Sequence, residues 1–247
     1  MDFSERFSGK AQDYIRYRPK YPAAMRDLLI LETGLLPTDC VADIGSGTGI
    51  SSEIFTENGN TVYAVEPNDD MRNAAEMLFR DEPKFISIKG SAEHTTLADK
   101  SIDLVFAGTA FHWFDIPETR KEFNRILKND GHIVISWNHR DLESPLQKKL
   151  EEIFGRHLEK IKKAENQKEG ESIKEFFGDQ EFKHTILKNT QQFTFPELMG
   201  RMRSSSYFPP KQDALYNILE TEIAEVFSTF EHNGKINFNY KTHIYWV

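Results

Sequence analysis

The chain contains little cysteine and no long hydrophobic run. Of its 247 residues only Cys40 is a cysteine, which excludes an internal disulfide and is typical of a protein from a reducing cytoplasm. The polar start of the chain, residues 1–10, has no apolar signal core, and no run approaches the roughly 18 apolar residues of a membrane span. We therefore expect a cytoplasmic protein with no secretory signal and no membrane partner.

Motifs for several chemistries are also absent from the sequence. No two of the eight histidines are four residues apart, and there is no CxxC or HExxH motif, so we expect no dedicated metal site. A GxSxG elbow and a GxxxxGK[ST] loop are missing too, which argues against hydrolases of that type and P-loop enzymes. The net charge of −8 disfavours a nucleic-acid partner, because phosphate contacts supply most of that affinity.

The composition and the order of the patterns favour an α/β enzyme. Hydrophobic residues make up 38% of the chain and aromatic residues 12%, enough to fill a sizeable core at this length. Helical and strand patterns alternate from Pro22 to Trp137, which predicts a doubly wound, mostly parallel sheet with right-handed crossovers. In such a sheet the ligand lies across the carboxyl ends of the strands.

Residues 41–49, with the sequence VADIGSGTG, combine a short apolar strand with a glycine-rich turn. Gly45, Gly47 and Gly49 allow a sharp backbone turn and let a ligand approach where a Cβ would clash. From Ser51 the pattern is helical, and we expect the first amides of that helix to point into the same crevice. A tight connection without a ligand also uses glycine, so the loop alone leaves both interpretations open.

A second strand ends at an acidic residue. The apolar residues Thr61 to Val65 are followed by Glu66, about where a nucleotide-binding unit places the acid that accepts from ribose hydroxyls. The alternative is a solvated or cap-like acid at a strand end. The glycine spacing separates two cofactor classes, because the dinucleotide fingerprint requires a third small residue where this chain has Ile50. A branched residue there argues against NAD and FAD.

The pattern instead resembles the first motif of class I S-adenosylmethionine-dependent methyltransferases, with Asp43 as the acid that precedes the glycines. The resemblance continues in order and spacing over roughly the first 140 residues. Residues 9–22 are similar to the start of the methyltransferase type 11 branch, which includes enzymes like trans-aconitate methyltransferase. The last hundred residues match loosely, mainly at residues 200–209.

The resemblance implies a seven-stranded Rossmann-like sheet and S-adenosylmethionine as the cofactor. Ser91-Ala92-Glu93 resembles the segment at the adenine edge, and residues 108–115, GTAFHWFD, resemble the segment beside the reactive methyl group. A lid from the opening segment would cover the methionine end, the alternative being an ordinary surface arm. The residues assigned to the cofactor by these arguments are Asp43, Gly45, Gly47, Gly49, Glu66, Ser91, Ala92, Glu93, Gly108, Thr109, Tyr14 and Arg18.

Three regions follow from the patterns. Residues 1–139 are expected to form the cofactor-binding core with an N-terminal lid arm. Residues 140–210, where the pattern loosens and Lys and Glu mix densely, are expected to be an inserted helical cap that bears the substrate site. Residues 211–247 contain a helical pattern and then an alternating one, which predicts a helix and a strand that complete the core.

His112 and Trp113 belong to the segment that the resemblance places beside the methyl group. The donor is already activated, so the protein mainly aligns the reactants. A carboxylate acceptor is ionised at neutral pH, whereas an amine or a hydroxyl must lose a proton. His112 is therefore either a base or acceptor ligand, or a packed histidine bonded to backbone at the turn. Trp113 is either a wall of the acceptor site or a core residue.

Several arginines fall in segments expected to border the crevice of an otherwise acidic protein. Arg140, Arg201 and Arg203 are the predicted substrate residues, with Arg16 and Arg18 in the opening segment. Guanidinium forks suit carboxylates, although each arginine is alternatively a solvated surface cation. We predict methyl transfer from S-adenosylmethionine to a small molecule, with a carboxylic acid as the expected acceptor. The alternatives are an NAD(P)-dependent oxidoreductase and a catalytically silent cofactor-binding sensor; the oligomeric state is not predicted.

Overall fold

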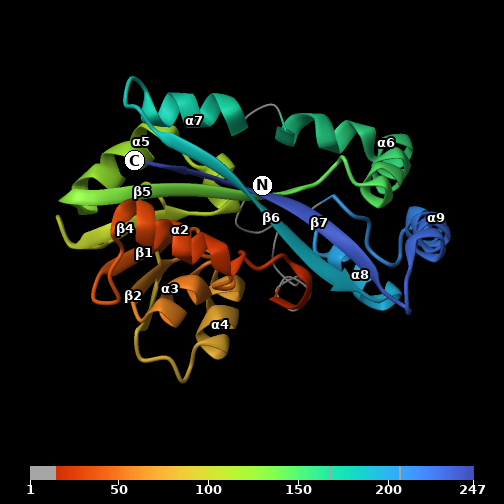
Figure 1. Ribbon diagram of the computed structural model, residues 1–247, viewed down its shortest axis with the longest axis horizontal. Coiled ribbons are helices and arrows are strands. Elements are labelled where there is room, and N and C mark those ends of the chain that lie inside the picture. Colours follow the sequence, from red (N-terminus) through yellow and green to blue (C-terminus); the bar gives the residue numbers. More distant parts are fainter. Residues whose placement is uncertain (1–14, 167–168, 206) are drawn as a thin grey trace.

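The computed structural model describes residues 15–166, 169–205 and 207–247, and it describes no side chain of residues 158–171. Its strands form one seven-stranded sheet in the order β3-β2-β1-β4-β5-β7-β6 (Figure 1). The pairs from β3 to β5 are parallel, whereas β7 runs antiparallel to both of its neighbours. The predicted doubly wound, mostly parallel Rossmann-like sheet is confirmed.

The parallel strands are short and buried because their residues are almost continuously apolar. β1, for example, buries four of its five residues. The bounds are β1 Cys40–Ile44, β2 Thr61–Val65, β3 Phe85–Ile88, β4 Ile102–Ala107, β5 Leu127–Arg140, β6 Lys183–Phe193 and β7 Ile236–Trp246.

Several helices begin at side-chain caps that the sequence supplies. Asn68 and Asp115 accept the backbone N–H of the third residue after them, and Thr194 forms a capping box with Glu197. The described helices are α2 Ala23–Thr33, α3 Ser52–Asn58, α4 Asp69–Leu78, the 3₁₀ helix η2 Thr109–Trp113, α5 Ile116–Ile126, α6 Pro145–Asn166, α7 Glu169–Phe177, α8 Phe195–Arg203 and α9 Ala214–Phe230.

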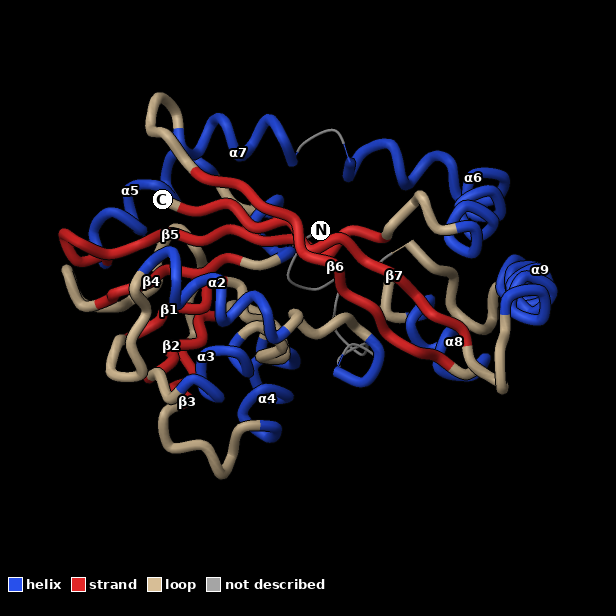
Figure 2. Tube along the Cα trace, in the orientation of Figure 1, coloured by secondary structure: helices blue, strands red, loops and turns tan. Residues whose placement is uncertain are grey.

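The molecule has two parts that share three strands. In the tube view, β5, β6 and β7 run from the half that contains β1 to β4 into a second half with α6, α8 and α9 (Figure 2). The segment predicted as a helical cap, residues 140–210, thus contains β6, one of the two edge strands of the sheet, besides its helices. We did not predict β6 from the sequence, because most of its residues are polar and its hydrophobic alternation is weak. Such a composition is expected of a strand with one face and one edge open to solvent.

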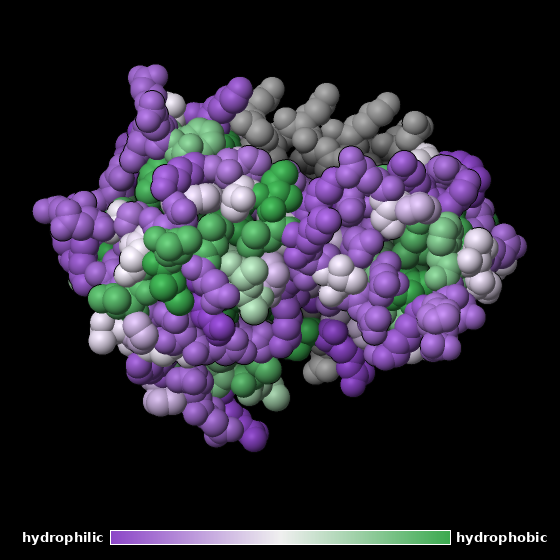
Figure 3. Space-filling view, viewed as in Figure 1, coloured by the Kyte–Doolittle hydropathy of each residue, from purple (hydrophilic) through white to green (hydrophobic). Residues whose placement is uncertain are grey.

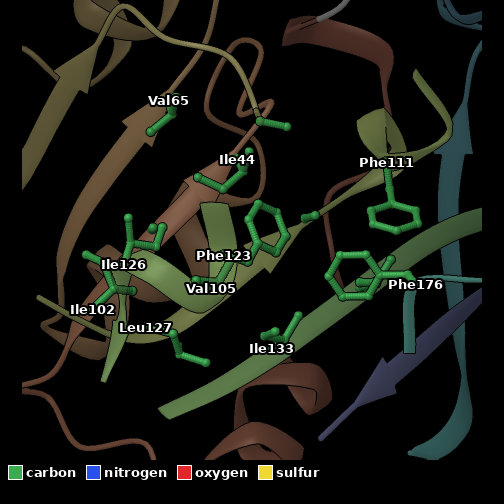
Figure 4. Close-up of a cluster of buried hydrophobic side chains, with 14 of the residues drawn as sticks. Ile44, Val65, Ile102, Val105, Phe111, Phe123, Ile126, Leu127, Ile133 and Phe176 are labelled. Atoms are coloured by element: carbon green, nitrogen blue, oxygen red, sulfur yellow. The ribbon is translucent and has the colours of Figure 1, made fainter. Parts of the chain in front are cut away.

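Apolar side chains from both faces of the sheet form the core. On the α5 and α7 side, Phe111 lies between Phe176 and Trp137, with ring centroids 5.2 and 5.8 Å apart (Figure 4). Figure 4 shows how side chains from β1, β4, β5, α5 and η2 meet there. This packing anchors η2, so the segment after β4 is held at the carboxyl end of the sheet by a buried phenylalanine.

Most of the surface seen in Figure 3 is hydrophilic, as expected of a chain with 28% charged residues. Hydrophobic residues gather there over part of the first half. Leu31 of α2 is largely exposed. None of the described helices combines the length and the apolar character needed to cross a membrane.

Candidate active site

The glycine loop joins β1 to α3 through three glycines with positive φ. Gly45, Gly47 and Gly49 have φ values of 67, 58 and 84°, a region that side chains disfavour. Around two of them the space is filled by protein, because an added Cβ would lie 2.6 Å from Ala110 at Gly45 and 2.5 Å from Phe79 at Gly49. At Gly47 an added Cβ would meet no atom within 4 Å. The middle of the loop is therefore the part that a ligand can approach.

Asp43, near the end of β1, is fully buried under this loop. Its Oδ2 accepts from the Ser51 and Ser52 hydroxyls at 2.7 and 2.6 Å, whereas its Oδ1 has no partner among the described residues. The Thr48 hydroxyl is likewise buried and has no described partner. Burial raises the pKa of Asp43 to about 6. A buried acid with one unused oxygen fits a ligand that brings a donor or a positive charge.

Glu66 follows β2 and is only 8% exposed, so it is not the solvated strand-end acid of the alternative interpretation. Its Oε2 accepts the Gly47 N–H at 2.9 Å and its Oε1 accepts the Asn68 N–H at 2.8 Å. Burial raises its pKa against the effect of these two hydrogen bonds. Each carboxylate oxygen keeps further acceptor capacity, so Glu66 can both hold the glycine loop and accept from a diol.

Residues 91–93, predicted beside the adenine, and residues 108–115, predicted beside the methyl group, lie next to each other. Glu93 accepts the backbone N–H of Asp115 at 3.0 Å and so ties the loop after β3 to the end of η2. Ser91 is half-buried and Ala92 is buried. Gly108 and Thr109 begin η2, which also carries His112 and Trp113 with ring centroids 4.4 Å apart. All of these residues follow β3 or β4 at the carboxyl end.

The N-terminal arm, residues 15–22, connects the carboxyl end of the parallel strands to the second half of the molecule. Lys20 forms an ion pair with Glu53 of α3 at 2.6 Å, and the Tyr21 hydroxyl would lie 2.7 Å from a Cβ on Gly108. At its other end Arg18 donates to the Ser204 carbonyl at 2.8 Å. Tyr14, the other predicted lid residue, lies outside the described residues.

Arginines from three distant segments converge where the arm meets the end of β5 and α8. Arg201 is 6% exposed and donates to the Tyr240 hydroxyl at 3.0 Å and to the Ser205 hydroxyl at 3.2 Å. The charges of Arg140, Arg201 and Arg18 together lower the pKa of the Tyr207 hydroxyl despite its burial. We call these three arginines the arginine cluster.

An acidic residue and two aromatic rings lie beside the arginine cluster. Arg140 pairs with Glu151 of α6 at 2.8 Å, and its guanidinium lies 5.4 Å from the centre of the Phe154 ring. Phe154 in turn packs near Tyr207, with ring centroids 6.2 Å apart. The site therefore combines fixed positive charge with apolar surface, a combination suited to an organic anion.

Two of the predicted arginines lie elsewhere. Arg203 extends from α8 toward α9, where its Nη1 is 3.5 Å from the Tyr216 hydroxyl. Arg16 lines a cavity of about 440 Å³ between the arm, β6 and α8, together with Glu197. Sequence reasoning missed Tyr207, Ser205 and Tyr240, because single tyrosines and serines carry no pattern and only the fold brings them to the arginines. Within the described residues, no group of three or more His, Cys, Asp or Glu is arranged to hold a metal ion.

Residues 42–135 match the model of a family described as a methyltransferase domain. A methyltransferase of Schizosaccharomyces pombe, termed uncharacterised, is 27% identical over 97% of this chain and 95% of its own length. An uncharacterised methyltransferase of Mycobacterium tuberculosis is 32% identical over 63% of the chain and 61% of its own length. The structure of a putative type II methyltransferase from Anaeromyxobacter dehalogenans covers 93% of this chain, and the chain covers 97% of it, with a TM-score of 0.67 at 18% identity.

The fold and the matches define the class. The strand order with an antiparallel β7 differs from the 3-2-1-4-5-6 order of dinucleotide-binding sheets, so the oxidoreductase alternative has no support. Residues 42–135 match a methyltransferase domain, and over nearly its whole length the chain is similar in sequence to a methyltransferase and in fold to class I methyltransferases, as the resemblance indicated. It is an enzyme of this class, and the silent-sensor alternative has no support either.

Proposed function

We propose that the protein transfers a methyl group from S-adenosylmethionine to a small carboxylic acid and so forms a methyl ester. The observation that carries the choice of acceptor is the convergence of the half-buried Arg18 and Arg140 with the buried Arg201. A relative from Marinomonas, named a malonyl-[acyl-carrier protein] O-methyltransferase, is 30% identical over 54% of the chain and 50% of its own length. The name of this relative specifies methyl transfer to oxygen, which supports the proposal of an oxygen acceptor.

The residues of the crevice fit the cofactor. Glu66 would hold the ribose hydroxyls, the open space at Gly47 would admit the ligand to the backbone, and Asp43 would face the amino end with its unused Oδ1. When bound, S-adenosylmethionine supplies a methyl group activated by its sulfonium. Tyr21 beside Gly108 would close this part of the crevice from the arm side.

The protein's contribution to the acceptor is binding and orientation. A carboxylate is already ionised at neutral pH and needs no base, so fixed guanidinium groups suffice to hold one oxygen in line with the methyl group. The hydrogen bonds from Arg201 to Tyr240 and Ser205 hold its guanidinium in one orientation, which lowers the entropy cost of binding. Glu151 keeps Arg140 in place in the same way.

Replacing Arg201 by Lys tests the acceptor class. The substitution keeps a positive charge but removes the guanidinium fork, and we expect KM for an accepted acid to rise about tenfold or more with cofactor affinity nearly unchanged. Arg156→Ala is the control, because Arg156 forms an exposed ion pair with Glu222. The assay is S-adenosylhomocysteine production from a panel of small acids, their amides, amines and phenols. Methylation of phenols or amines but of no acid would contradict the proposal.

His112→Ala separates the two interpretations of His112. For an acid acceptor we expect both the cofactor affinity and the turnover of the variant to stay near wild type, because no proton has to be removed. If the acceptor is a hydroxyl or an amine, turnover should fall by roughly 10² to 10⁴ through loss of a general base. Steady-state rates over the same panel, with calorimetry for the cofactor, distinguish these results.

Cofactor affinity should fall as the pH drops through about 6. The buried Asp43 binds its proton up to about that pH, and a positively charged amino group favours the carboxylate, so binding must expel the proton below pH 6. The Asp43→Asn variant should lose most of this pH dependence. At every pH it should bind the cofactor with the low affinity that the wild type shows below pH 6. Calorimetry from about pH 5 to about pH 8, a range that brackets the Asp43 pKa of about 6, measures it. A wild-type affinity that is flat across pH 6 would remove Asp43 from the site.

A further inference from the structure

Two amide side chains of β6 hold the N-terminal arm by its backbone. Asn189 donates from Nδ2 to the Lys20 carbonyl at 2.7 Å, and Gln191 donates from Nε2 to the Arg18 carbonyl at 3.2 Å. The two amides are two residues apart on β6 and therefore lie on one face of that strand. The two carbonyls are also two residues apart, in the opposite chain direction, so the arm lies along β6 in a defined antiparallel register.

The arm is stiff where β6 holds it. Pro19 and Pro22 fix their own φ angles, and each favours an extended backbone in the residue before it. Residues 18–22 therefore lose little conformational freedom when they are held. A shift at one end of this segment moves the other end as well.

The held segment joins two regions that a methyl transfer has to align. Toward the cofactor crevice, Lys20 pairs with Glu53 of α3, the helix after the glycine loop, at 2.6 Å. Toward the second half, Arg18 donates to the carbonyl of Ser204, directly after α8, at 2.8 Å. The register of the arm on β6 thus determines how α8 is placed relative to the glycine loop.

We propose that Asn189 and Gln191 are positioning residues of the methyl transfer, which keep the arm in register and so align an acceptor beside α8 with the methyl group. The inference rests on the proposed function for the place of the acceptor, but it does not require that the acceptor be an acid. In-line attack tolerates little misplacement of the reactants, so an arm that slides along β6 lowers the rate more than the binding.

The surroundings of the two amides support a role beyond stability. The Oε1 atom of Gln191 is buried and has no hydrogen-bond partner among the described residues, so the amide brings an unsatisfied polar atom into the fold. An apolar side chain of similar size would avoid this cost but could not hold the arm. Asn189 donates to the Asn138 side chain of β5 at 3.2 Å as well, which ties the arm to a second strand.

The substitutions Gln191→Met and Asn189→Leu test the inference, because they remove the donors at nearly constant size and add no charge. We expect each to lower kcat roughly two- to tenfold, the contribution of one hydrogen bond. The double variant should lower kcat by roughly tenfold or more, since both bonds hold the same segment. KM for the acceptor and the calorimetric Kd of S-adenosylmethionine should stay within about twofold of wild type.

Stability and proteolysis separate positioning from a merely structural role. The melting temperature of Gln191→Met should not fall, because the unsatisfied Oε1 is lost together with the amide. Trypsin cleaves after lysine, and cleavage after Lys20, followed by mass spectrometry, should become faster when either amide is removed, since the arm then opens more often. This measurement needs no acceptor.

Thr190→Val and Gln192→Met are the matched controls on the opposite face of β6. Thr190 donates to Asn239 of β7 at 3.0 Å, and Gln192 donates to Asn237 of β7 at 3.1 Å. Each control removes a donor from the same strand without touching the two bonds to the arm. Both should keep the kcat of the wild type and its rate of cleavage after Lys20.

The rate assay is S-adenosylhomocysteine production with any acceptor that the panel identifies. Equal kcat values in the variants and the controls overturn the inference, as does a rate of cleavage after Lys20 that the substitutions leave unchanged. A higher KM with an intact kcat would assign the amides to binding and overturn it too. Methylation of amines or phenols but of no acid overturns the proposed acceptor; a kcat that still falls in the variants then supports the alignment by Asn189 and Gln191.

Discussion

Replacing Gly47 by Val is expected to weaken S-adenosylmethionine binding by well over tenfold while the protein stays folded. Gly47 has a φ of 58°, and it is the glycine of this loop where an added Cβ would meet open space rather than protein. The branched side chain would therefore project into the space left for the cofactor, and it would also strain the turn by about 1–2 kcal/mol. Calorimetry gives the affinity, and circular dichroism shows whether the variant is folded.

A second glycine separates the effect on the ligand from the backbone strain. Gly234, in the turn before β7, has a φ of 74° and no atom within 4 Å of an added Cβ. Gly234→Val should lose a similar amount of stability and keep the cofactor affinity of the wild type. Unchanged affinity in a folded Gly47→Val variant would remove the loop from the cofactor site.

Glu66→Ala is expected to cost about 1.5–3 kcal/mol of cofactor binding, or roughly 10- to 150-fold in Kd, because two ribose hydroxyls lose a charged acceptor. The same carboxylate accepts the Gly47 and Asn68 N–H groups, so part of the loss reflects a less ordered loop. Glu66→Gln should be milder, since its amide oxygen still accepts. Binding measured by calorimetry beside thermal melting separates the two contributions.

The matched control for Glu66 is Glu122, another buried acid that accepts a backbone N–H, here from Thr95 at 2.7 Å. Glu122 also pairs with Arg125 of α5 at 2.8 Å, and neither Thr95 nor Arg125 belongs to the glycine loop. Glu122→Ala should lower the melting temperature and leave cofactor affinity intact. If Glu66→Ala gave that same result, Glu66 would be a structural residue.

The elements proposed to hold the cofactor were predictable from the sequence because their signals are local. A run of apolar residues, three evenly spaced glycines and an acid after the next strand lie within residues 41–66, and a parallel sheet brings strand ends together whatever the rest of the chain does. The structure places Gly47 and Glu66 in contact as that reasoning requires. It adds that Gly45 and Gly49 are packed against Ala110 and Phe79, which the spacing alone did not show.

The edge strand β6 was harder to predict from the sequence. β6 alternates polar residues with few apolar ones, so its hydrophobic pattern is weak, and its place is determined by the register of eleven residue pairs with β7. Such pairing joins segments far apart in the chain and leaves no local signature. The segment predicted as a cap therefore contributes a strand as well as helices.

The sequence by itself determined the class of sheet, the glycine loop and the acids proposed to bind the cofactor, because each depends on neighbours along the chain. Only the tertiary structure decided which of the arginines meet. Arg18, Arg140 and Arg201 belong to the arm, β5 and α8, and they meet at Tyr207 because β5 and β7 extend past the parallel strands into the second half. Arg203, two residues from Arg201 on α8, contacts Tyr216 of α9 instead, since successive helical positions point in different directions.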